Sequence, residues 1–111
     1  MRVYTDTLSA DGSSTTYLIE GAQGTEEIER IGFSASGTWG SGTLTLYVCL
    51  NPSASPQVFV NVCDSSGTAL GYTADVSGNL EVSGGALVKA TLSGSTTPSL
   101  AVTFRGDIAK A

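Results

Sequence analysis

The stretch that decides the fold is Gly37-Thr-Trp-Gly-Ser-Gly-Thr-Leu-Thr-Leu-Tyr-Val-Cys-Leu50. It begins as a glycine-rich turn and continues as a segment in which Leu and Val alternate with Thr, Tyr and Cys. An alternation of period two over this length is typical of a β-strand that has one face on a hydrophobic core. We therefore expect Leu44, Leu46, Val48 and Leu50 to face the core, and Thr43, Thr45, Tyr47 and Cys49 to face outward.

The same alternation recurs along the chain, in short stretches separated by turn residues. Turn signals at intervals of about 8–12 residues are typical of a β-sandwich or barrel. Because 111 residues suffice for one domain, we predict an all-β fold over residues 1–111. This fold is a single antiparallel β-sandwich or jelly-roll-like domain of about eight short strands. The other strands are expected at 3–8, 15–20, 27–35, 57–63, 68–74, 79–83, 86–92 and 99–105, with a turn at Ser77-Gly-Asn79.

Two hairpins follow if strands that are consecutive in the sequence also pair in space. Paired residues must share a face, which fixes the register of each hairpin. The first hairpin then pairs Leu50 with Val58, Val48 with Val60, and Leu46 with Val62. The last hairpin pairs Leu92 with Leu100, Ala90 with Val102, and Val88 with Phe104.

The register of the first hairpin also bears on the two cysteines. It places Cys49 and Cys63 on the outward face, about 13 Å apart along the ladder. A disulfide requires Cα atoms within about 7 Å of each other. We therefore predict two free thiols, which suits assembly in a reducing cytoplasm.

The composition argues against several classes of partner. Ten acidic and five basic residues give a net charge of −5, and the basic residues are scattered, whereas phosphate binding requires a basic footprint. No apolar run approaches the ~20 residues that cross a membrane, and the first residues lack the apolar core of a signal peptide. We expect neither nucleic acid nor membrane as a partner, and we expect synthesis and use without export.

The residues needed for most catalytic sites are missing or scattered. The chain has no histidine, which removes the Ser-His-Asp and Cys-His sites and the commonest ligand of transition metals. Glu26, Glu27 and Glu29 are clustered, and either form a solvated rim or supply a carboxylate pair of the kind that hydrolyses glycosides. Asp64 and Asp75 lie in turns, without the spacing of a calcium loop. We expect no enzyme, no cofactor and no metal.

Aromatic and terminal residues supply the candidates for contact with other subunits. Aromatic side chains are enriched at protein interfaces. Trp39 is either a buried anchor of its turn or a contact residue, and the ends of the chain, 1–8 and 106–111, are either extended arms or ordinary edge strands. The candidate interface residues are Val3, Tyr4, Trp39, Tyr47, Phe59 and Ile108.

Two parts of the second half of the chain resemble a known class of protein. The front part is the glycine-rich turn and strand from Gly37 to Leu46, followed by a polar loop and a Val-rich strand. The rear part is Val82-Ser-Gly-Gly-Ala-Leu-Val-Lys-Ala-Thr-Leu-Ser-Gly-Ser-Thr-Thr-Pro-Ser-Leu-Ala-Val-Thr103. This pattern, over roughly residues 35–105, resembles the small β-sandwich virion proteins of tailed bacteriophages. The chain departs from that pattern in having Lys89 where an Arg is common, and a proline loop at 51–56 where an Asp-Gly-Gly turn is common.

The resemblance implies a non-enzymatic virion structural protein. The expected function is that of a capsid decoration, or cement, protein that binds the major capsid protein on the outer surface as a homotrimer and stabilises the shell. Its expected location is the virion, after assembly in the host cytoplasm. The alternatives are a tail adaptor, tube or fibre-associated subunit and, from another class, a carbohydrate-binding β-sandwich module.

Overall fold

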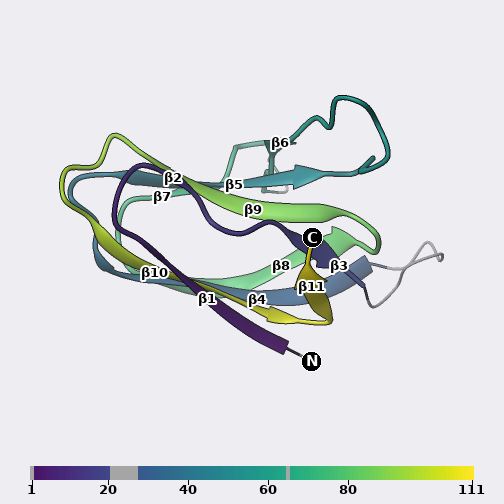
Figure 1. Cartoon of the computed structure of the whole chain (residues 1–111), viewed down its shortest axis with the longest axis horizontal. Helices are drawn as coiled ribbons and strands as arrows, with labels where there is room; N and C mark the ends of the chain where they lie inside the picture. The colour runs from purple at the N-terminus through teal and green to yellow at the C-terminus, as the bar shows by residue number, and fades with distance from the viewer. Residues whose placement is uncertain (1, 21–27, 65) are drawn as a thin grey trace.

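The chain folds into two antiparallel sheets packed face to face (Figure 1). The computed structural model describes residues 2–20, 28–64 and 66–111. Regular structure in these ranges consists of eleven β-strands. The predicted all-β sandwich is therefore confirmed, with more strands than expected because several are only two or three residues long. Glu26 and Glu27 lie outside the described residues, as does the first position of the strand expected at 27–35.

The first sheet, sheet A, has four long strands. Its order is β1, β10, β4, β8, and every neighbouring pair is antiparallel. Strands β1 and β8 therefore form its two borders. The strands are β1 (Arg2–Leu8), β10 (Ser99–Gly106), β4 (Ile28–Thr38) and β8 (Val76–Ser83).

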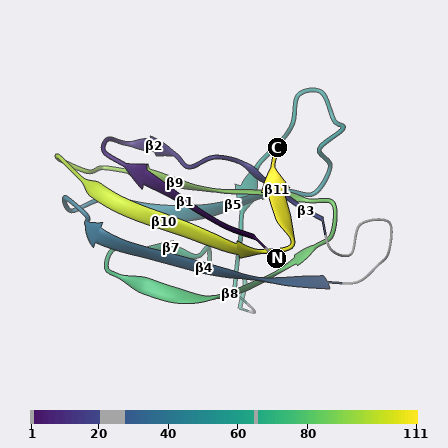
Figure 2. The same cartoon turned by 60° about the horizontal axis from the view of Figure 1, so that its bottom comes forward.

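The second sheet, sheet B, combines two long strands with several short ones. Its main order is β11, β3, β9, β5, β6, with β2 added beside β9 and β7 beside β5. Figure 1 shows the two sheets as separate layers, and Figure 2 shows β8 at the lower border of sheet A. The strands are β2 (Gly12–Ser13), β3 (Tyr17–Ile19), β5 (Thr43–Cys49), β6 (Val60–Asn61), β7 (Gly71–Tyr72), β9 (Leu87–Ser93) and β11 (Ile108–Lys110).

The core lies between the two sheets and is centred on an aromatic group. The ring of Phe104 lies 5.4 Å from that of Tyr17 and 5.3 Å from that of Phe33, measured between centroids. Tyr17 belongs to sheet B, and the two phenylalanines belong to neighbouring strands of sheet A. Tilted pairs at this separation are favourable, contributing about 0.5–1.5 kcal/mol each beyond the burial of area.

The expected facing of β5 is confirmed for most of its length. Leu44, Leu46 and Val48 are buried in the core, but Leu50 is 67% exposed. Leu50 lies beyond the last residue of β5, where the alternation continues but the core does not. Cys49 was expected to be exposed, and it is buried instead. Its partner across the ladder is Leu87, which is buried on the same outward side of sheet B.

The first predicted hairpin is confirmed in register, and the last one is wrong. Val48 lies opposite Val60, and the carbonyl of Leu46 accepts a hydrogen bond from the amide of Val62. Strands β9 and β10, however, belong to different sheets. The 94–98 segment connects the two sheets and does not form a hairpin turn within one of them. The apolar residues of β9 and β10 still face the core, but from opposite sides.

A second error concerns the turn expected at Ser77-Gly-Asn79. These three residues lie inside β8, opposite Ser34, Phe33 and Gly32 of β4. Polar and glycine residues are tolerated there because β8 is a border strand with an exposed outer face. Turn-forming residue types did not mark a turn at this place.

The two ends of the chain are border strands. Strand β1 pairs with β10 over all of its seven residues, and β11 pairs with β3. The guanidinium of Arg2 donates to the carbonyl of Ile108 at 3.0 Å, which ties the two ends together. Residues 2–8 and 108–110 are therefore ordinary edge strands and not extended arms.

The glycine-rich turn at 37–42 is structural. Gly40 has a φ of +58°, and a Cβ there would overlap the backbone of Thr96. The close approach allows the amide of Thr96 to donate to the carbonyl of Gly40 at 2.9 Å. The indole N–H of Trp39 donates to the carboxylate of Asp75 at 2.9 Å, and Trp39 is buried. Trp39 is therefore the buried anchor of this turn.

The burial of Ile108 provides a test of the fold. Replacing Ile108 by Ala removes a fully buried side chain, so we expect the free energy of unfolding to fall by about 2–5 kcal/mol. Chemical denaturation followed by the fluorescence of the single tryptophan, Trp39, measures this change. Val3→Ala is the control, because Val3 is 57% exposed and should shift stability by about 0.5 kcal/mol or less. Equal effects of the two substitutions would contradict the docked position of β11.

Candidate functional site

The six candidate interface residues do not form one surface. Val3 is exposed on β1, whereas Tyr47 and Phe59 are half-buried on the far side of sheet B. Trp39 and Ile108 lie in the core, so neither offers a surface to a partner. Ile108 was a candidate because it lies near the end of the chain, and for Trp39 the alternative of a buried turn anchor is the one that holds.

Tyr4 is also occupied within the monomer. Its ring stacks on that of Tyr17 at 5.1 Å, and the ammonium of Lys110 lies 5.6 Å from its centroid. The hydroxyl of Tyr17 also donates to the carboxylate of Asp6 at 2.7 Å. Burial, followed by that hydrogen bond and the charge of Asp6, raises the pKa of Tyr17 to about 12. The group is a structural link between β1 and β3.

Tyr47 and Phe59 are both neighbours of Lys89. Tyr47 lies opposite Lys89 across the β5–β9 ladder, and the ammonium of Lys89 lies 4.2 Å from the centroid of the Phe59 ring. A cation at this distance from a ring face is attracted by about 0.5–2 kcal/mol. The contact holds the end of the β5–β6 loop against the outward face of sheet B.

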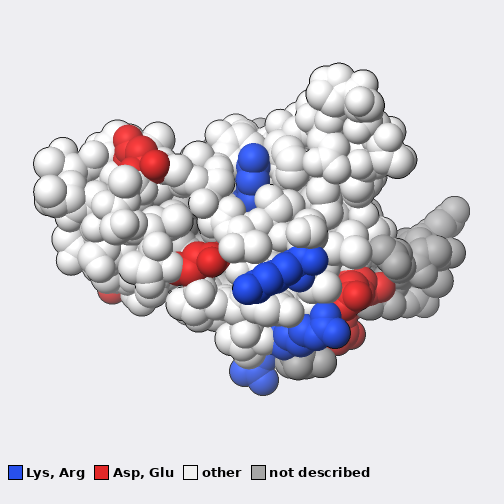
Figure 3. Space-filling model, in the orientation of Figure 1, with Lys and Arg blue, Asp and Glu red and all other residues white. Residues whose placement is uncertain are grey.

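The β5–β6 loop is an ordered, uncharged projection. The side-chain amide of Gln57 donates to the carbonyl of Pro52 at 2.7 Å, and the hydroxyl of Ser53 donates to the side-chain oxygen of Asn51 at 3.0 Å. Residues 50–60 include no Lys, Arg, Asp or Glu. The same projection stands at the upper right of Figure 1, and it carries no charged atoms in Figure 3.

Three large apolar side chains are exposed around this loop. Leu50 is 67% exposed, Val58 62% and Val60 54%. Val60 lies opposite Val48, and the other two residues are each two positions away from this pair along the chain. Single exposed apolar residues are common, whereas exposed apolar side chains gathered in one place are typical of interaction sites. We call Leu50, Val58 and Val60 the apolar patch. The alternation of the sequence placed all three in the core, so their exposure was missed.

The outward face of sheet A has a different character, because its side chains are short and polar. The registers place Thr5, Thr103, Ser34 and Ser77 in one row across all four strands. The hydroxyls of Thr5 and Thr103 are 2.9 Å apart and hydrogen-bonded. We call this surface the hydroxyl face.

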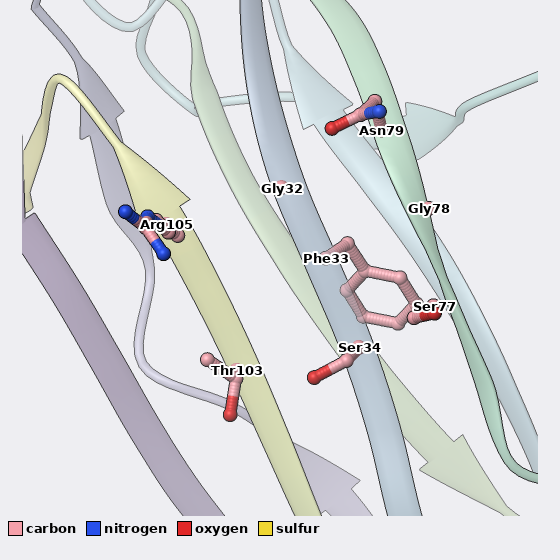
Figure 4. Close-up of a pocket in the computed structure, with 8 residues that line it drawn as sticks. All are labelled: Gly32, Phe33, Ser34, Ser77, Gly78, Asn79, Thr103 and Arg105. Carbon is pink, nitrogen blue, oxygen red and sulfur yellow. The ribbon is translucent and has the colours of Figure 1, made fainter.

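A shallow hollow of about 360 Å³ lies on the hydroxyl face (Figure 4). It forms where Gly32, which has no side chain, lies in one row between Arg105 of β10 and Asn79 of β8. Such a surface offers hydrogen-bond donors and acceptors but no aromatic platform for a sugar ring. The lining residues are Gly32, Phe33, Ser34, Ser77, Gly78, Asn79, Thr103 and Arg105.

Two of the described carboxylates hold turns or loops of the fold. Asp11 accepts hydrogen bonds from the amides of Gly94 and Ser95 and from the Ser95 hydroxyl. Asp64 accepts from the amides of Ser66 and Thr68 within its own turn. Within residues 2–20, 28–64 and 66–111, no group of three or more His, Cys, Asp or Glu side chains is placed to hold a metal ion. In the same ranges both cysteines are free, as predicted.

Comparisons with known proteins add no relative. No protein-family model, curated protein or solved structure matches the chain. In the part of the chain that the structure describes, no helix is long and apolar enough to cross a membrane.

The hydrogen bonds to Asp11 predict an acid-sensitive loop contact. The Ser95 hydroxyl, then the Ser95 and Gly94 amides, lower the pKa of Asp11 below its usual 3.8. A lowered pKa in the folded state stabilises the fold at higher pH, and this contribution is lost as the pH falls through the folded pKa. We expect Asp11→Asn to be less stable than the wild type near neutral pH, with a difference that shrinks below about pH 4.

Denaturation of both proteins between about pH 7 and pH 2.5 measures this difference. Ser95→Ala is the second variant, because it removes the strongest of these donors. It should raise the pKa of Asp11 toward its ordinary value and weaken the pH dependence. Parallel stability curves for the wild type and Asp11→Asn would show that the contact has no effect.

Proposed function

We propose that the protein is a non-enzymatic structural subunit of a bacteriophage virion. Its most specific role would be that of a capsid decoration protein, which binds the major capsid protein and stabilises the shell. The observation that carries the proposal is the apolar patch on an ordered, uncharged loop. The resemblance of residues 35–105 to small virion β-sandwiches supports the same role.

The patch suits permanent attachment to a larger surface. The loop is ordered before binding, by its own hydrogen bonds and by the contact between Phe59 and Lys89. A preordered loop loses little conformational entropy on binding, so that more of its contact energy appears as affinity. The absence of charge on residues 50–60 also avoids the desolvation cost that a buried charge would add.

The mechanism of stabilisation would be thermodynamic linkage. A ligand that binds the assembled shell but not its separated subunits stabilises the assembly by mass action. A small protein that contacts two neighbouring subunits adds buried interface area to the shell, and standard interfaces bury about 1,200–2,000 Å². No bond has to be made or broken, which agrees with a site built from Leu and Val side chains.

Co-sedimentation with expanded capsid shells tests the role. The wild-type protein should pellet with the shells, and the double variant Leu50→Glu/Val58→Glu should remain in the supernatant. Both positions are more than half exposed, so the variant should keep its thermal unfolding temperature. We expect the affinity to fall by about a hundredfold or more, because two charges would be buried without partners.

Val3→Glu is the matched control, because it places the same charge at an exposed valine on another side of the molecule. This variant should bind the shells like the wild type. Loss of binding in Val3→Glu alone would move the contact to β1. A wild-type protein that binds purified tails and not shells would assign the subunit to the tail.

A further inference from the structure

The free border of β8 is the most open strand edge of the described structure. Strand β8 pairs with β4 over all of its eight residues, and within residues 2–20, 28–64 and 66–111 no other strand pairs with it. In Figure 2 it forms the lower border of sheet A. The backbone hydrogen bonds of the neighbouring 61–70 segment run to its own residues and to β5, and none within the described residues joins it to β8. An open strand edge carries unpaired N–H and C=O groups that can accept another strand.

The other borders are short or carry their own protection. Strands β6 and β7 have two residues each, and β11 has three. Strand β1 is long and pairs only with β10, but its charged side chains Arg2 and Asp6 point inward, where Arg2 donates to the carbonyl of Ile108 and Asp6 accepts from Tyr17. Inward-pointing charges are one of the devices that protect a border strand. Only β8 therefore combines length with an unprotected edge among the described strands.

The sequence of β8 does not protect this edge. Proteins usually blunt an exposed border strand with Pro, Lys, a bulge or an inward-pointing charge. The strand Val76-Ser-Gly-Asn-Leu-Glu-Val-Ser83 has no Pro and no Lys. Its one charge, Glu81, points outward and is paired with Arg30 at 2.9 Å within the same sheet.

We infer that β8 pairs antiparallel with β8 of a second copy of this chain, which joins two copies of sheet A into one continuous sheet. A twofold axis that passes beside Asn79 places Asn79 opposite itself, Ser77 opposite Glu81 and Val76 opposite Val82. Partners in this register share a face, as a β-ladder requires. The arrangement is isologous, so it closes as a dimer.

Charge and side-chain size select this register among its neighbours. An axis at Glu81 would place two carboxylates directly opposite each other, which destabilises a ladder. An axis at Leu80 would place Val82 opposite Gly78 and leave Val76 without a partner in the strand. The axis at Asn79 pairs each Glu81 with a serine hydroxyl and each Val82 with a valine. Each chain has a net charge of −5, but the one charged residue of β8, Glu81, is paired with Arg30 of its own sheet. The two strands therefore meet without opposing carboxylates.

This inference changes the oligomer that the resemblance implied. A homotrimer of this kind would join unlike borders head to tail, and the border of β1, with its inward-pointing charges Arg2 and Asp6, suits strand addition less than that of β8. The dimer does not depend on the proposed capsid role, and it can be measured on the free protein.

Two lysine substitutions test the pairing by sedimentation. Analytical ultracentrifugation of the wild type should show a dimer whose fraction rises with concentration. Asn79→Lys places two like charges opposite each other across the axis, so it should raise the dimer Kd by about fivefold. Ser77→Lys is the matched control, because its lysine faces Glu81 of the other copy, and it should dimerise at least as strongly as the wild type. Both side chains are exposed in the monomer, so both variants should keep the wild-type unfolding temperature.

A disulfide scan tests the register independently. In a Cys63→Ser background, which removes the exposed native thiol, Asn79→Cys should form a covalent dimer on mild oxidation, and Glu81→Cys should not. Opposite residues of an antiparallel ladder lie about 4.5–5.5 Å apart at their Cα atoms, which suits a disulfide. A wild type that stays monomeric at millimolar concentration, or cross-linking of Glu81→Cys and not of Asn79→Cys, would overturn the inference.

Discussion

The packing of Phe104 against Tyr17 and Phe33 is the contact on which the fold depends. It joins sheet A to sheet B at the centre of the core, with ring centroids 5.3 to 5.4 Å apart. A large buried aromatic contributes about 1.5–3 kcal/mol through removal of its area from water. A domain of this size is stable by only about 5–15 kcal/mol. The loss of one such ring would therefore remove much of this stability.

The dominance of this core explains why the sequence predicted the fold class and missed part of the topology. Alternation shows which residues are buried, and Leu44, Leu46 and Val102 are buried as expected. It does not show which sheet a strand belongs to, because β9 and β10 bury the same residues whether they pair beside each other or face each other across the core. The path of the 94–98 segment decides between these arrangements. That path is held by the contacts of Asp11 and Gly40 with Gly94, Ser95 and Thr96, which are long-range in the sequence.

The candidate site was predicted less well, for a related reason. Whether an apolar side chain of a strand is exposed depends on how far the opposite sheet extends over that strand. The alternation in the sequence does not show where the opposite sheet ends. Leu50, Val58 and Val60 continue the alternation of buried strands, but they lie beyond the covered part of sheet B. Conversely, Trp39 and Ile108 lie next to glycine-containing turns, yet both are buried. The only local signs of the loop were Pro52 and Pro56, and these residues do not report which neighbours are exposed.

The two sides of the sandwich differ in how they are closed, and this difference limits where assembly can occur. Side chains bridge the sheets at the β1 side, where Arg2 reaches Ile108 and Asp6 reaches Tyr17. The Arg2–Glu20 ion pair on that side is about half exposed, so it contributes little stability. Charged side chains at a border strand nevertheless oppose the addition of another strand. The opposite side carries β8, whose edge is open, and the apolar patch lies near the border of sheet B formed by β6. The chain has few charges to repel a neighbour. The proposed contacts with other subunits therefore rest on the backbone groups of β8 and on the apolar patch, both on this less bridged side.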